Sequence, residues 1–309
     1  MGILDGRVVI VTGGGRGLGR EHCLAMAAEG AIVVVNDLGV GLKGEGEIAE
    51  ESPAESVVRE ITELGGVAAA NGASASDFDG VRDLVESTVE QFGRLDAVVN
   101  NAGILRDRVI TSMTEDDFDA VIAVHVKGTF NLMKHACDYW RGIAKNGGAV
   151  SGRIINTTSG AGLWGNVGQT NYAAAKCAIA GMTLTVAQEM ERYNVTANAI
   201  SPLAYTRMTA SAMGDYTPPE QGWDRRDPAN ASPVVAWLAS EQSGWLTGAV
   251  LRIDGATVQR LNPWEIDPAA QYTSKGGERL SVDEIDLGLR KAYRLMPSGL
   301  PSNSIVARK

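Results

Sequence analysis

Short apolar runs alternate along the chain with longer segments that carry apolar residues at helical spacing. The apolar runs, which we expect to form strands, are Arg7–Thr12, Ile32–Asp37, Val67–Ala70, Ala97–Asn100, Arg153–Thr157, Thr196–Ile200 and Val250–Ile253. The helical segments between them are Gly19–Glu29, Ser52–Leu64, Gly80–Phe92, Phe118–Arg141 and Ala173–Arg192. Apolar runs without polar alternation are typical of strands that are buried on both faces of a sheet. The alternation predicts an α/β fold, with a doubly wound parallel sheet of about seven strands and helices on both faces.

Three segments interrupt this alternation. Leu38–Ala54 is rich in glycine and glutamate and follows the second predicted strand as an insertion. Met208–Ser232 contains three prolines and has no clear periodicity, and long loops are often functional, so we expect a substrate lid at about residues 208–232. Residues 258–309 are expected to form a C-terminal extension with a helix at Ser281–Leu295. The pattern therefore predicts a single domain over residues 1–257, followed by this extension.

The composition narrows the classes of partner. The net charge is −9 and no run of lysine and arginine is longer than two, which argues against nucleic acid or an anionic membrane as a partner. The three cysteines are widely spaced and belong to no Cys/His cluster, so we expect neither disulfides nor a metal site. No basic and apolar leader precedes the first strand, and no window of about 18 apolar residues occurs. We expect a cytoplasmic protein with a small-molecule substrate.

A glycine-rich loop follows the first predicted strand. From Thr12 to Gly19 the sequence reads T-G-G-G-R-G-L-G, and a predicted helix begins at once. Glycines let the backbone turn tightly and approach a pyrophosphate, whose charge then meets the N–H groups of the helix N-terminus. Asp37 ends the second predicted strand, where a carboxylate accepts hydrogen bonds from the adenosine ribose and repels a 2′-phosphate. These features predict a dinucleotide site that prefers NAD to NADP.

Arg16, within the same loop, is a conflicting signal. A guanidinium at this position can pair with the 2′-phosphate of NADP. We expect Asp37 to neutralise Arg16, which leaves NAD as the favoured cofactor.

A tyrosine and a lysine mark the candidate chemistry. Tyr172 and Lys176 lie four residues apart at the start of a predicted helix and so share one helical face. Tyrosine is a poor base at neutral pH, and a nearby ammonium is expected to lower its pKa and suit it to proton exchange with an alcohol. Such a pair alone is most often structural. Ser159 and Asn100, however, each follow or end another predicted strand, and the carboxyl ends of parallel strands share one edge of the sheet. We therefore expect a catalytic site at this edge.

Taken in chain order, these motifs resemble those of the short-chain dehydrogenase/reductase family. They are T-G-x-x-x-G-x-G, N-N-A-G, a serine thirteen residues before Y-x-x-x-K, and N-A-I-S-P. The resemblance covers about residues 5–257 and implies a single Rossmann-type domain. It implies that Tyr172 is the general acid/base, that Lys176 assists it and binds the nicotinamide ribose, and that Ser159 orients the substrate oxygen. The residues that it implies for cofactor binding are Gly13, Arg16, Gly17, Leu18, Gly19, Asp37, Ser74, Asn100, Ala102, Gly103, Tyr172, Lys176, Pro202 and Thr206.

The sequence departs from the family pattern at four places. His125 stands where an asparagine of the proton relay is usual, although a lone histidine in a helix is more often a hydrogen-bonded core residue. Ser74 begins a pair that replaces the usual Asp-Val at the adenine contact. The segment Pro202–Thr206 is one residue shorter than its counterpart and lacks the glycine, and the insertion after Asp37 is the fourth departure. The predicted catalytic residues are Ser159, Tyr172, Lys176 and His125.

Several of these departures resemble one branch of the family. They occur in N-D-L-G, N-N-A-G-I-L-R-D-R, H-V-K-G and G-N-V-G-Q-T-N-Y-A-A-A-K. These segments are similar to the (3R)-hydroxyacyl-CoA dehydrogenase domain of type 2 multifunctional enzymes, also called 17β-hydroxysteroid dehydrogenase type 4. The resemblance implies NAD-dependent oxidation of a (3R)-3-hydroxyacyl-CoA or of a sterol side-chain hydroxyacyl-CoA.

The lid sequence permits such a substrate. Met213, Tyr216 and Trp223 suit an apolar acyl or sterol body, and Arg225-Arg226 suits the phosphates of CoA, although a solvated arginine pair is commoner in loops. The alternatives are an NADPH-dependent 3-ketoacyl reductase, a hydroxysteroid dehydrogenase and a non-catalytic dinucleotide-binding protein. The family also implies a homo-oligomer, a dimer or tetramer, for which the apolar faces of the two longest predicted helices are suited.

Overall fold

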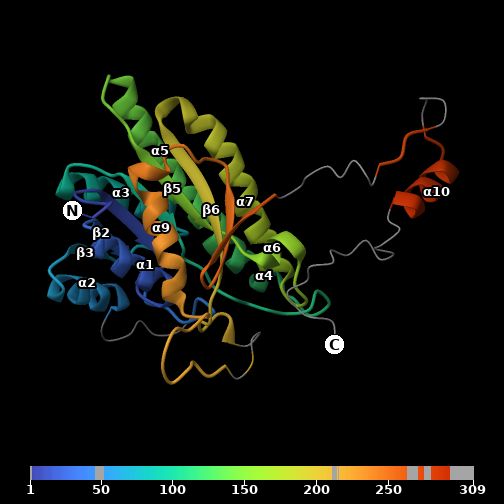
Figure 1. Ribbon diagram of the computed structural model, residues 1–309, viewed down its shortest axis with the longest axis horizontal. Helices are drawn as coiled ribbons and strands as arrows, with labels where there is room; N and C mark the ends of the chain where they lie inside the picture. Colours follow the sequence, from blue (N-terminus) through green and yellow to red (C-terminus); the bar gives the residue numbers. More distant parts are fainter. Residues whose placement is uncertain are drawn as a thin grey trace.

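A mostly parallel sheet forms the centre of the molecule (Figure 1). The computed structural model describes residues 2–45, 52–210, 214, 216–262, 271–274 and 280–292. Within them the strands are β1 (Val8–Thr12), β2 (Ile32–Asn36), β3 (Val67–Asn71), β4 (Ala97–Asn100), β5 (Gly152–Thr157), β6 (Val195–Leu203), β7 (Val250–Asp254) and β8 (Thr257–Leu261). Their order is β3-β2-β1-β4-β5-β6-β7-β8, and all neighbours are parallel except β7 and β8. The predicted doubly wound parallel sheet is confirmed.

The order of the strands reverses at β1. β1 pairs with β2 on one side and with β4 on the other, with Val9 opposite both Val33 and Ala97. Every residue of β1 and β4 is buried, which explains why these strands read as uninterrupted apolar runs. Ligands of open α/β sheets bind at the carboxyl ends of the strands beside such a reversal. The topology therefore fixes the position of the candidate site.

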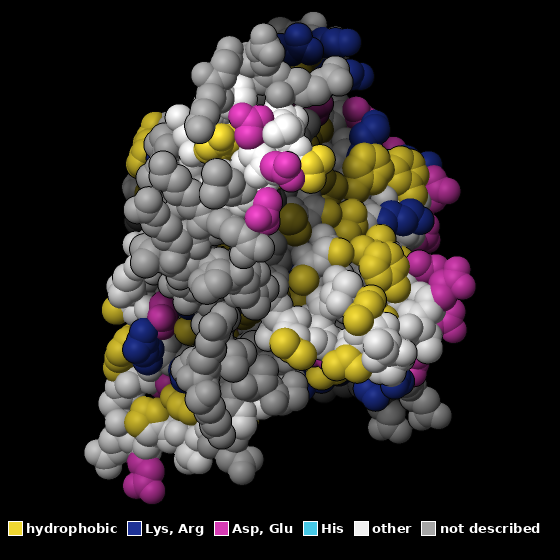
Figure 2. Space-filling view, turned by 90° about the vertical axis from the view of Figure 1, so that its right-hand side faces the viewer, with side chains coloured by type: hydrophobic (Ala, Val, Ile, Leu, Met, Phe, Trp, Pro, Cys, Tyr) yellow, Lys and Arg dark blue, Asp and Glu magenta, His cyan; other side chains and the backbone are white. Residues whose placement is uncertain are grey.

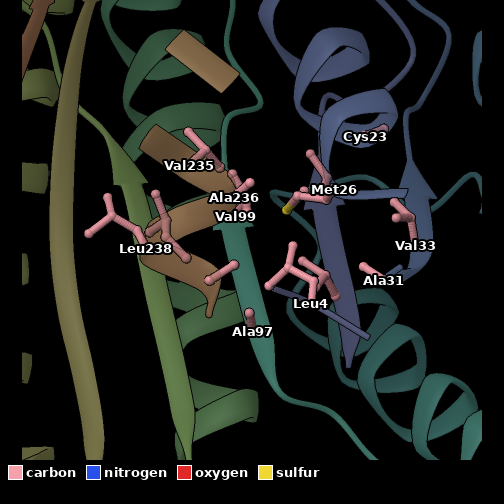
Figure 3. Packing of buried hydrophobic residues seen from close by; sticks show 14 of the residues in the cluster. Leu4, Cys23, Met26, Ala31, Val33, Ala97, Val99, Val235, Ala236 and Leu238 are labelled. Carbon is pink, nitrogen blue, oxygen red and sulfur yellow. The ribbon is translucent and has the colours of Figure 1, made fainter. Parts of the chain in front are cut away.

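Helices cover both faces of the sheet (Figure 1). One face carries α1 (Gly17–Ala28), α2 (Pro53–Glu63) and α9 (Ser232–Ala239), and the other carries α3 (Phe78–Phe92), α5 (Gly128–Lys145) and α7 (Thr170–Met190). Figure 3 shows the first of these layers, where Met26 of α1 and Val235 of α9 point toward Val99 and Leu4. Each face thus has its own apolar core, and the polar chemistry is confined to the ends of the strands.

The predicted helix Phe118–Arg141 is in fact three consecutive helical segments. They are α4 (Glu115–Ile122), a π-helical turn at Ala123–Lys127, and α5. α4 begins earlier than expected because Thr114 and Asp117 form a reciprocal capping box that fixes its first turn. π-helical turns are rare and frequently occur at functional sites. His125 lies in the middle of this one.

The sheet has one strand more than the apolar runs predicted. β8 follows β7 through a two-residue turn that contains Gly255, whose φ is +56°. Four of the five residues of β8 are exposed at the edge of the sheet, so they need no apolar pattern, and no apolar run marks this strand in the sequence. Residues 258–261 of the predicted extension thus belong to β8, an edge strand of the sheet.

The predicted extension also contains α10 (Val282–Ala292), which stands apart from the sheet in Figure 1. Residues 293–295 of the predicted helix Ser281–Leu295 lie outside the described residues, as does Met213 of the predicted lid. No helix among the described residues is both long enough and apolar enough to cross a membrane.

Replacing the buried indole of α5 tests the second core. Trp140 is 1% exposed and donates Nε1–H to the Leu95 carbonyl at 2.7 Å. We expect Trp140→Ala to lower the free energy of unfolding by about 3–5 kcal/mol, because it leaves a large cavity and an unpaired carbonyl. Urea titration followed by circular dichroism measures this change. Trp245→Ala is the matched control: Trp245 is 76% exposed, and we expect a change of roughly 0.5 kcal/mol. Equal losses in the two variants would contradict the assignment of Trp140 to the core.

Candidate active site

The glycine-rich loop between β1 and α1 turns tightly and closes on the start of the helix. Gly13 and Gly17 have φ angles of +63° and +53°, which favour glycine. A Cβ at Gly19 would lie 2.0 Å from the Gly13 carbonyl oxygen, so this position has no room for a side chain. The first turn of α1 carries no acidic side chain, so its N–H groups face the loop without a competing negative charge. This loop is shaped for a phosphate group.

Two polar side chains that sequence reasoning did not single out fix this loop to its neighbour. Thr12 Oγ1 accepts the backbone N–H groups of Asn101 and Ala102, both at 3.2 Å. Asn101 in turn donates Nδ2 to the carbonyls of Thr12 and Gly13, at 3.2 and 3.0 Å. Both residues belong to the quoted motifs, but the sequence does not show which motif residues bind a ligand and which bind one another. Thr12 and Asn101 hold the ends of β1 and β4 in one arrangement.

Asp37 follows β2 at the same edge of the sheet. Its carboxylate accepts the N–H of Gly15 at 3.0 Å and that of Gly39 at 2.8 Å, which places it against the glycine-rich loop. Arg16 donates to the Val40 carbonyl at 3.1 Å rather than pairing with Asp37. The expected neutralisation of Arg16 by Asp37 is therefore wrong, because the insertion after β2 supplies a backbone acceptor for the guanidinium.

The other predicted cofactor residues either follow a strand or belong to one. Thr206, which follows β6, has its methyl group 3.9 Å from the position of a Cβ on Gly17, so it faces the glycine-rich loop. Ser74 follows β3 and bonds Ser76 Oγ at 3.0 Å. Asn100 instead donates Nδ2 to Asn156 Oδ1 at 2.9 Å, so its side chain links β4 to β5. Pro202 lies inside β6, opposite Ile253 of β7. It follows the last residue of β6 that pairs with β5, so the N–H that proline lacks is not missed by that neighbouring strand.

The helix that carries the catalytic pair is anchored by Asn171. This side chain is completely buried and donates Nδ2 to the carbonyls of Arg106 and Asp117, at 3.0 and 2.9 Å. Its Oδ1 accepts the backbone N–H of Tyr172 at 2.8 Å. Asn171 is thus a positioning residue for Tyr172, and its burial was not visible from its place beside a tyrosine in the sequence.

Tyr172, Lys176 and Ser159 come together as the sequence predicted. Lys176 Nζ donates to the Thr157 carbonyl at 2.7 Å and lies 5.5 Å from the centre of the Tyr172 ring. Ser159 caps α6 (Gly160–Trp164) and is close enough to Tyr172 for its hydrogen bond to lower the tyrosine pKa. The hydroxyl and phenol groups therefore point at one place, where they can bind one substrate oxygen.

Burial dominates the protonation of this pair. It raises the pKa of Tyr172 to about 12; the Ser159 hydrogen bond opposes this shift and the charge of Asp107 adds to it. Burial also lowers the pKa of Lys176 to about 7. The expected net lowering of the tyrosine pKa does not occur in this structure, because burial outweighs the contributions that favour the phenolate. The phenol is therefore protonated at neutral pH in this structure, and a positive charge entering the site would favour its ionisation.

His125 also belongs to this cluster. It is completely buried, and its ring lies 5.2 Å from that of Tyr172 at an angle of 87°. Nε2 contacts both the N–H and the carbonyl of Ile104, at 3.1 and 2.9 Å, so either tautomer satisfies one of the two. Nδ1 is buried and has no hydrogen-bond partner among the described residues. Burial and the charge of Lys176 lower the pKa of His125 to about 3, so the ring is neutral.

Gly103, another predicted cofactor residue, makes room for this ring. A Cβ at Gly103 would lie 2.3 Å from His125 Cε1. The glycine of the N-N-A-G motif therefore has a packing role here. Elsewhere at this edge, within the residues that the structure describes, no three His, Cys, Asp or Glu side chains could hold a metal ion.

The described part of the predicted lid is tied to β7. Arg225 forms two hydrogen bonds with the Asp254 carboxylate, at 2.9 and 2.8 Å, so one of the two arginines expected to meet CoA phosphates is already paired. Trp223 donates Nε1–H to Asn230 at 3.1 Å but remains 60% exposed. The Tyr216 hydroxyl donates a hydrogen bond to the Asp224 carboxylate, and the centres of the Tyr216 and Tyr205 rings are 5.0 Å apart. These aromatic rings stand close to the carboxyl end of β6.

Comparison with known proteins gives a consistent picture. The short chain dehydrogenase family model matches residues 7–216. A peroxisomal hydratase-dehydrogenase-epimerase of Neurospora crassa is 42% identical over 261 residues, which cover 84% of this chain and 27% of that protein. The hydroxyacyl-CoA dehydrogenase ChsB1 of Mycobacterium tuberculosis is 42% identical over 269 residues, which cover 84% of this chain and 81% of that protein. This chain therefore spans only about a quarter of the fungal protein but most of the mycobacterial one.

Two solved structures share the fold. A crystal structure of a short chain dehydrogenase from Mycobacterium avium is 49% identical, with a TM-score of 0.83, and the match covers 95% of this chain and 96% of that one. A short chain dehydrogenase from Mycobacterium paratuberculosis, bound to NAD, is 27% identical, with a TM-score of 0.70, over 82% of this chain and 98% of that one. The sheet order, the glycine-rich loop and the Ser-Tyr-Lys cluster agree with these likenesses, and the chain belongs to the short-chain dehydrogenase/reductase family of oxidoreductases.

Proposed function

We propose that the protein oxidises the 3-hydroxyl group of a (3R)-3-hydroxyacyl-CoA, or of a sterol side-chain hydroxyacyl-CoA, with NAD as hydride acceptor. The buried cluster of Ser159, Tyr172 and Lys176 beside the glycine-rich loop carries the proposal, because it can bind and deprotonate a carbinol at the dinucleotide edge. The choice of substrate class is supported by the similarity to the hydroxyacyl-CoA dehydrogenase ChsB1.

In this proposal the side chains act on one carbinol. Ser159 Oγ donates to or accepts from the hydroxyl oxygen, and Tyr172 Oη removes its proton. Lys176 stabilises the phenolate from across the ring. His125 Nδ1, which has no partner among the described residues, is available for a water that passes protons to or from this cluster.

The residues present fit a dinucleotide. The positive φ angles at Gly13 and Gly17 let the loop turn tightly, and the missing side chain of Gly19 lets the N-terminus of α1 pack against the loop, where its N–H groups would meet a pyrophosphate. Asp37 stands where it would accept bonds from the adenosine ribose, and Thr206 faces the loop from β6. The oxidised cofactor would supply the hydride acceptor and, until the hydride is transferred, a positive charge. We infer NAD rather than NADP because the Asp37 carboxylate would repel a 2′-phosphate.

An NADPH-dependent 3-ketoacyl reductase, which works in the opposite direction, is the second candidate. Tyr172 has a raised pKa and so carries the proton that ketone reduction needs. Arg16, bound to a single carbonyl, could turn to a 2′-phosphate. The cofactor ratio and the pH profile below separate the two candidates.

A homo-oligomer stays a prediction, as do the domain boundary at residue 257 and the cytoplasmic location. The predicted helical faces leave Phe118 and Phe130 39% and 45% exposed, and nearby Ile110 is 68% exposed. Figure 2 shows hydrophobic side chains gathered on part of the face that it presents, which supports a contact with a second subunit.

Removing the phenol hydroxyl tests the mechanism. We expect Tyr172→Phe to lower kcat about 100- to 10,000-fold, because the proton acceptor is lost, while NAD affinity changes little. Absorbance at 340 nm measures turnover and calorimetry measures NAD binding. Tyr193→Phe, in the 3-10 turn that follows α7, is the matched control and should keep its rate. Turnover by Tyr172→Phe within threefold of the wild type would refute the role of this phenol.

Neutralising Asp37 tests the cofactor assignment. Asp37→Asn removes the charge and keeps one acceptor oxygen, so it can still accept the N–H of Gly15 or that of Gly39, which bond different carboxylate oxygens of Asp37. We expect the ratio of kcat/KM with NADP to that with NAD to rise roughly tenfold, since the repulsion of the 2′-phosphate is lost. Asp5→Asn, an exposed carboxylate before β1, is the control. A wild-type enzyme that prefers NADPH would contradict the proposal and favour the reductase.

The raised tyrosine pKa predicts opposite pH dependences for the two directions. Alcohol oxidation needs the phenolate, so its kcat/KM should rise between about pH 6 and pH 9, below the pKa of Tyr172. Ketone reduction needs the protonated phenol and should not rise over the same interval. Initial rates in both directions measure these profiles. An oxidation rate that falls as the pH increases would contradict the assignment of Tyr172 as the base.

A further inference from the structure

Two stretches that lie far apart in the sequence meet at the segment after β4. The insertion after β2 contributes the Leu42 carbonyl, which accepts the N–H of Leu105 at 3.1 Å. The start of α7 contributes Asn171, whose Nδ2 donates to the Arg106 carbonyl at 3.0 Å and whose Oδ1 accepts the N–H of Tyr172. Leu105 and Arg106 thus connect the insertion on one side with the catalytic helix on the other. The proposed mechanism gives this connection no role.

The Arg106 side chain holds the insertion by two further contacts. Its Nε donates to the Lys43 carbonyl at 3.1 Å, and its Nη2 lies 2.6 Å from Glu45 Oε1. Its Nη1 reaches the Asp116 carbonyl at 3.5 Å. The Arg106 side chain is 17% exposed, so this guanidinium is largely covered by the groups that it binds. A covered guanidinium with several acceptors holds its partners more firmly than an exposed ion pair does.

The part of the insertion that Arg106 holds is a closed turn. The N–H of Gly41 donates to the Glu45 carbonyl at 3.1 Å, and that of Gly44 donates to the Gly41 carbonyl at 3.0 Å. Gly44 has a φ of +79°, and a Cβ on it would lie 3.3 Å from Ile104 Cδ1, so the turn packs against the segment after β4. Because the turn is closed by its own backbone, release from Arg106 would let the whole turn move.

The described residues of the insertion, 38–45, cross the strand ends that a dinucleotide must also cross. They leave β2 at Asp37 and reach the segment after β4, and β1 lies between these two strands in the sheet. On the way, the Val40 carbonyl accepts Nη1 of Arg16 in the glycine-rich loop at 3.1 Å. The proposed dinucleotide takes the same course, because Asp37 would bind its adenosine ribose and Tyr172 stands at its nicotinamide end. The two would therefore lie side by side over the end of β1.

We propose that residues 38–45 form a strap across the outer side of the dinucleotide site and that Arg106 is the positioning residue that holds this strap in place. The inference rests on the proposed dinucleotide site but not on the identity of the alcohol. A cofactor held between the strap and the glycine-rich loop leaves only when the strap moves aside. Loss of the Arg106 contacts therefore speeds the release of the cofactor.

The rate of NADH release tests the strap. The enzyme–NADH complex is mixed with excess NAD in a stopped-flow instrument, and the fall in nicotinamide fluorescence gives the dissociation rate constant. We expect Arg106→Gln to raise this constant about tenfold, because the shorter amide loses the Lys43 carbonyl and Glu45. Glu45→Gln removes only the ion pair and should raise it roughly threefold. Arg82→Gln is the matched control: it removes an arginine of α3 that pairs with Asp79 at 2.7 Å, and it should leave the release rate unchanged.

A measurement on the wild type keeps the test independent of how well the variants fold. Lys43 is an exposed residue of the strap, so trypsin cleavage after Lys43 reports on the access to this segment. Mass spectrometry follows this cleavage and that after Lys145, an exposed residue at the end of α5. NADH should slow the cleavage after Lys43 roughly fivefold and leave that after Lys145 unchanged.

The outcomes separate the strap from the proposed function. Unchanged NADH release in Arg106→Gln and in Glu45→Gln overturns the strap, even where urea titration shows that Arg106→Gln is less stable, because a purely structural role lowers stability without changing release. Cleavage after Lys43 that NADH does not slow also overturns it. A wild-type enzyme that shows the expected effects on release and cleavage, but does not turn over a 3-hydroxyacyl-CoA, supports the strap and overturns the proposed substrate.

Discussion

Buried polar side chains, each hydrogen-bonded to the backbone of another segment, hold the active-site edge of this protein together. Lys176 binds the Thr157 carbonyl at the end of β5, His125 binds Ile104 after β4, and Asn171 binds two carbonyls in the segments before and within α4. A buried carbonyl or amide without a partner is costly, so each bond specifies one arrangement of its segments. The catalytic geometry is therefore fixed before any ligand arrives, by contacts that no ligand needs to supply.

The burial that fixes these side chains also sets their protonation. It raises the pKa of Tyr172 and lowers those of Lys176 and His125, so all three groups are drawn toward their neutral forms. A site of this kind responds strongly to the charge of whatever enters it. A bound cation favours the phenolate and therefore oxidation, whereas an anion beside Tyr172 opposes it.

The insertion after β2 is part of this edge rather than an appendage. Its backbone accepts Arg16 of the glycine-rich loop at Val40, and the Leu42 carbonyl accepts the N–H of Leu105 at 3.1 Å. Arg106 reaches the carbonyl of Lys43 at 3.1 Å. The described residues of the insertion thus connect the loop after β1 with the segment after β4. Because Arg16 bonds the insertion, it does not pair with Asp37. The Asp37 carboxylate instead accepts a backbone N–H of the glycine-rich loop.

The sequence by itself determined the sheet, its two helical layers and the residues gathered at its carboxyl edge. Continuous apolar runs can be satisfied only between two covering layers, and chain order then places Gly13, Asp37, Ser159 and Tyr172 at one edge. Other features of the fold and the site were decided only by the tertiary structure, because the pattern of apolar and polar residues does not encode them. The edge strand β8 needs no apolar run, the π-helical turn at His125 depends on its packing against Ile104, and Asn100 bonds Asn156 rather than facing the cleft. The direction of the Tyr172 pKa shift was decided there too, because burial and the distances between charges exist only once distant segments have packed together.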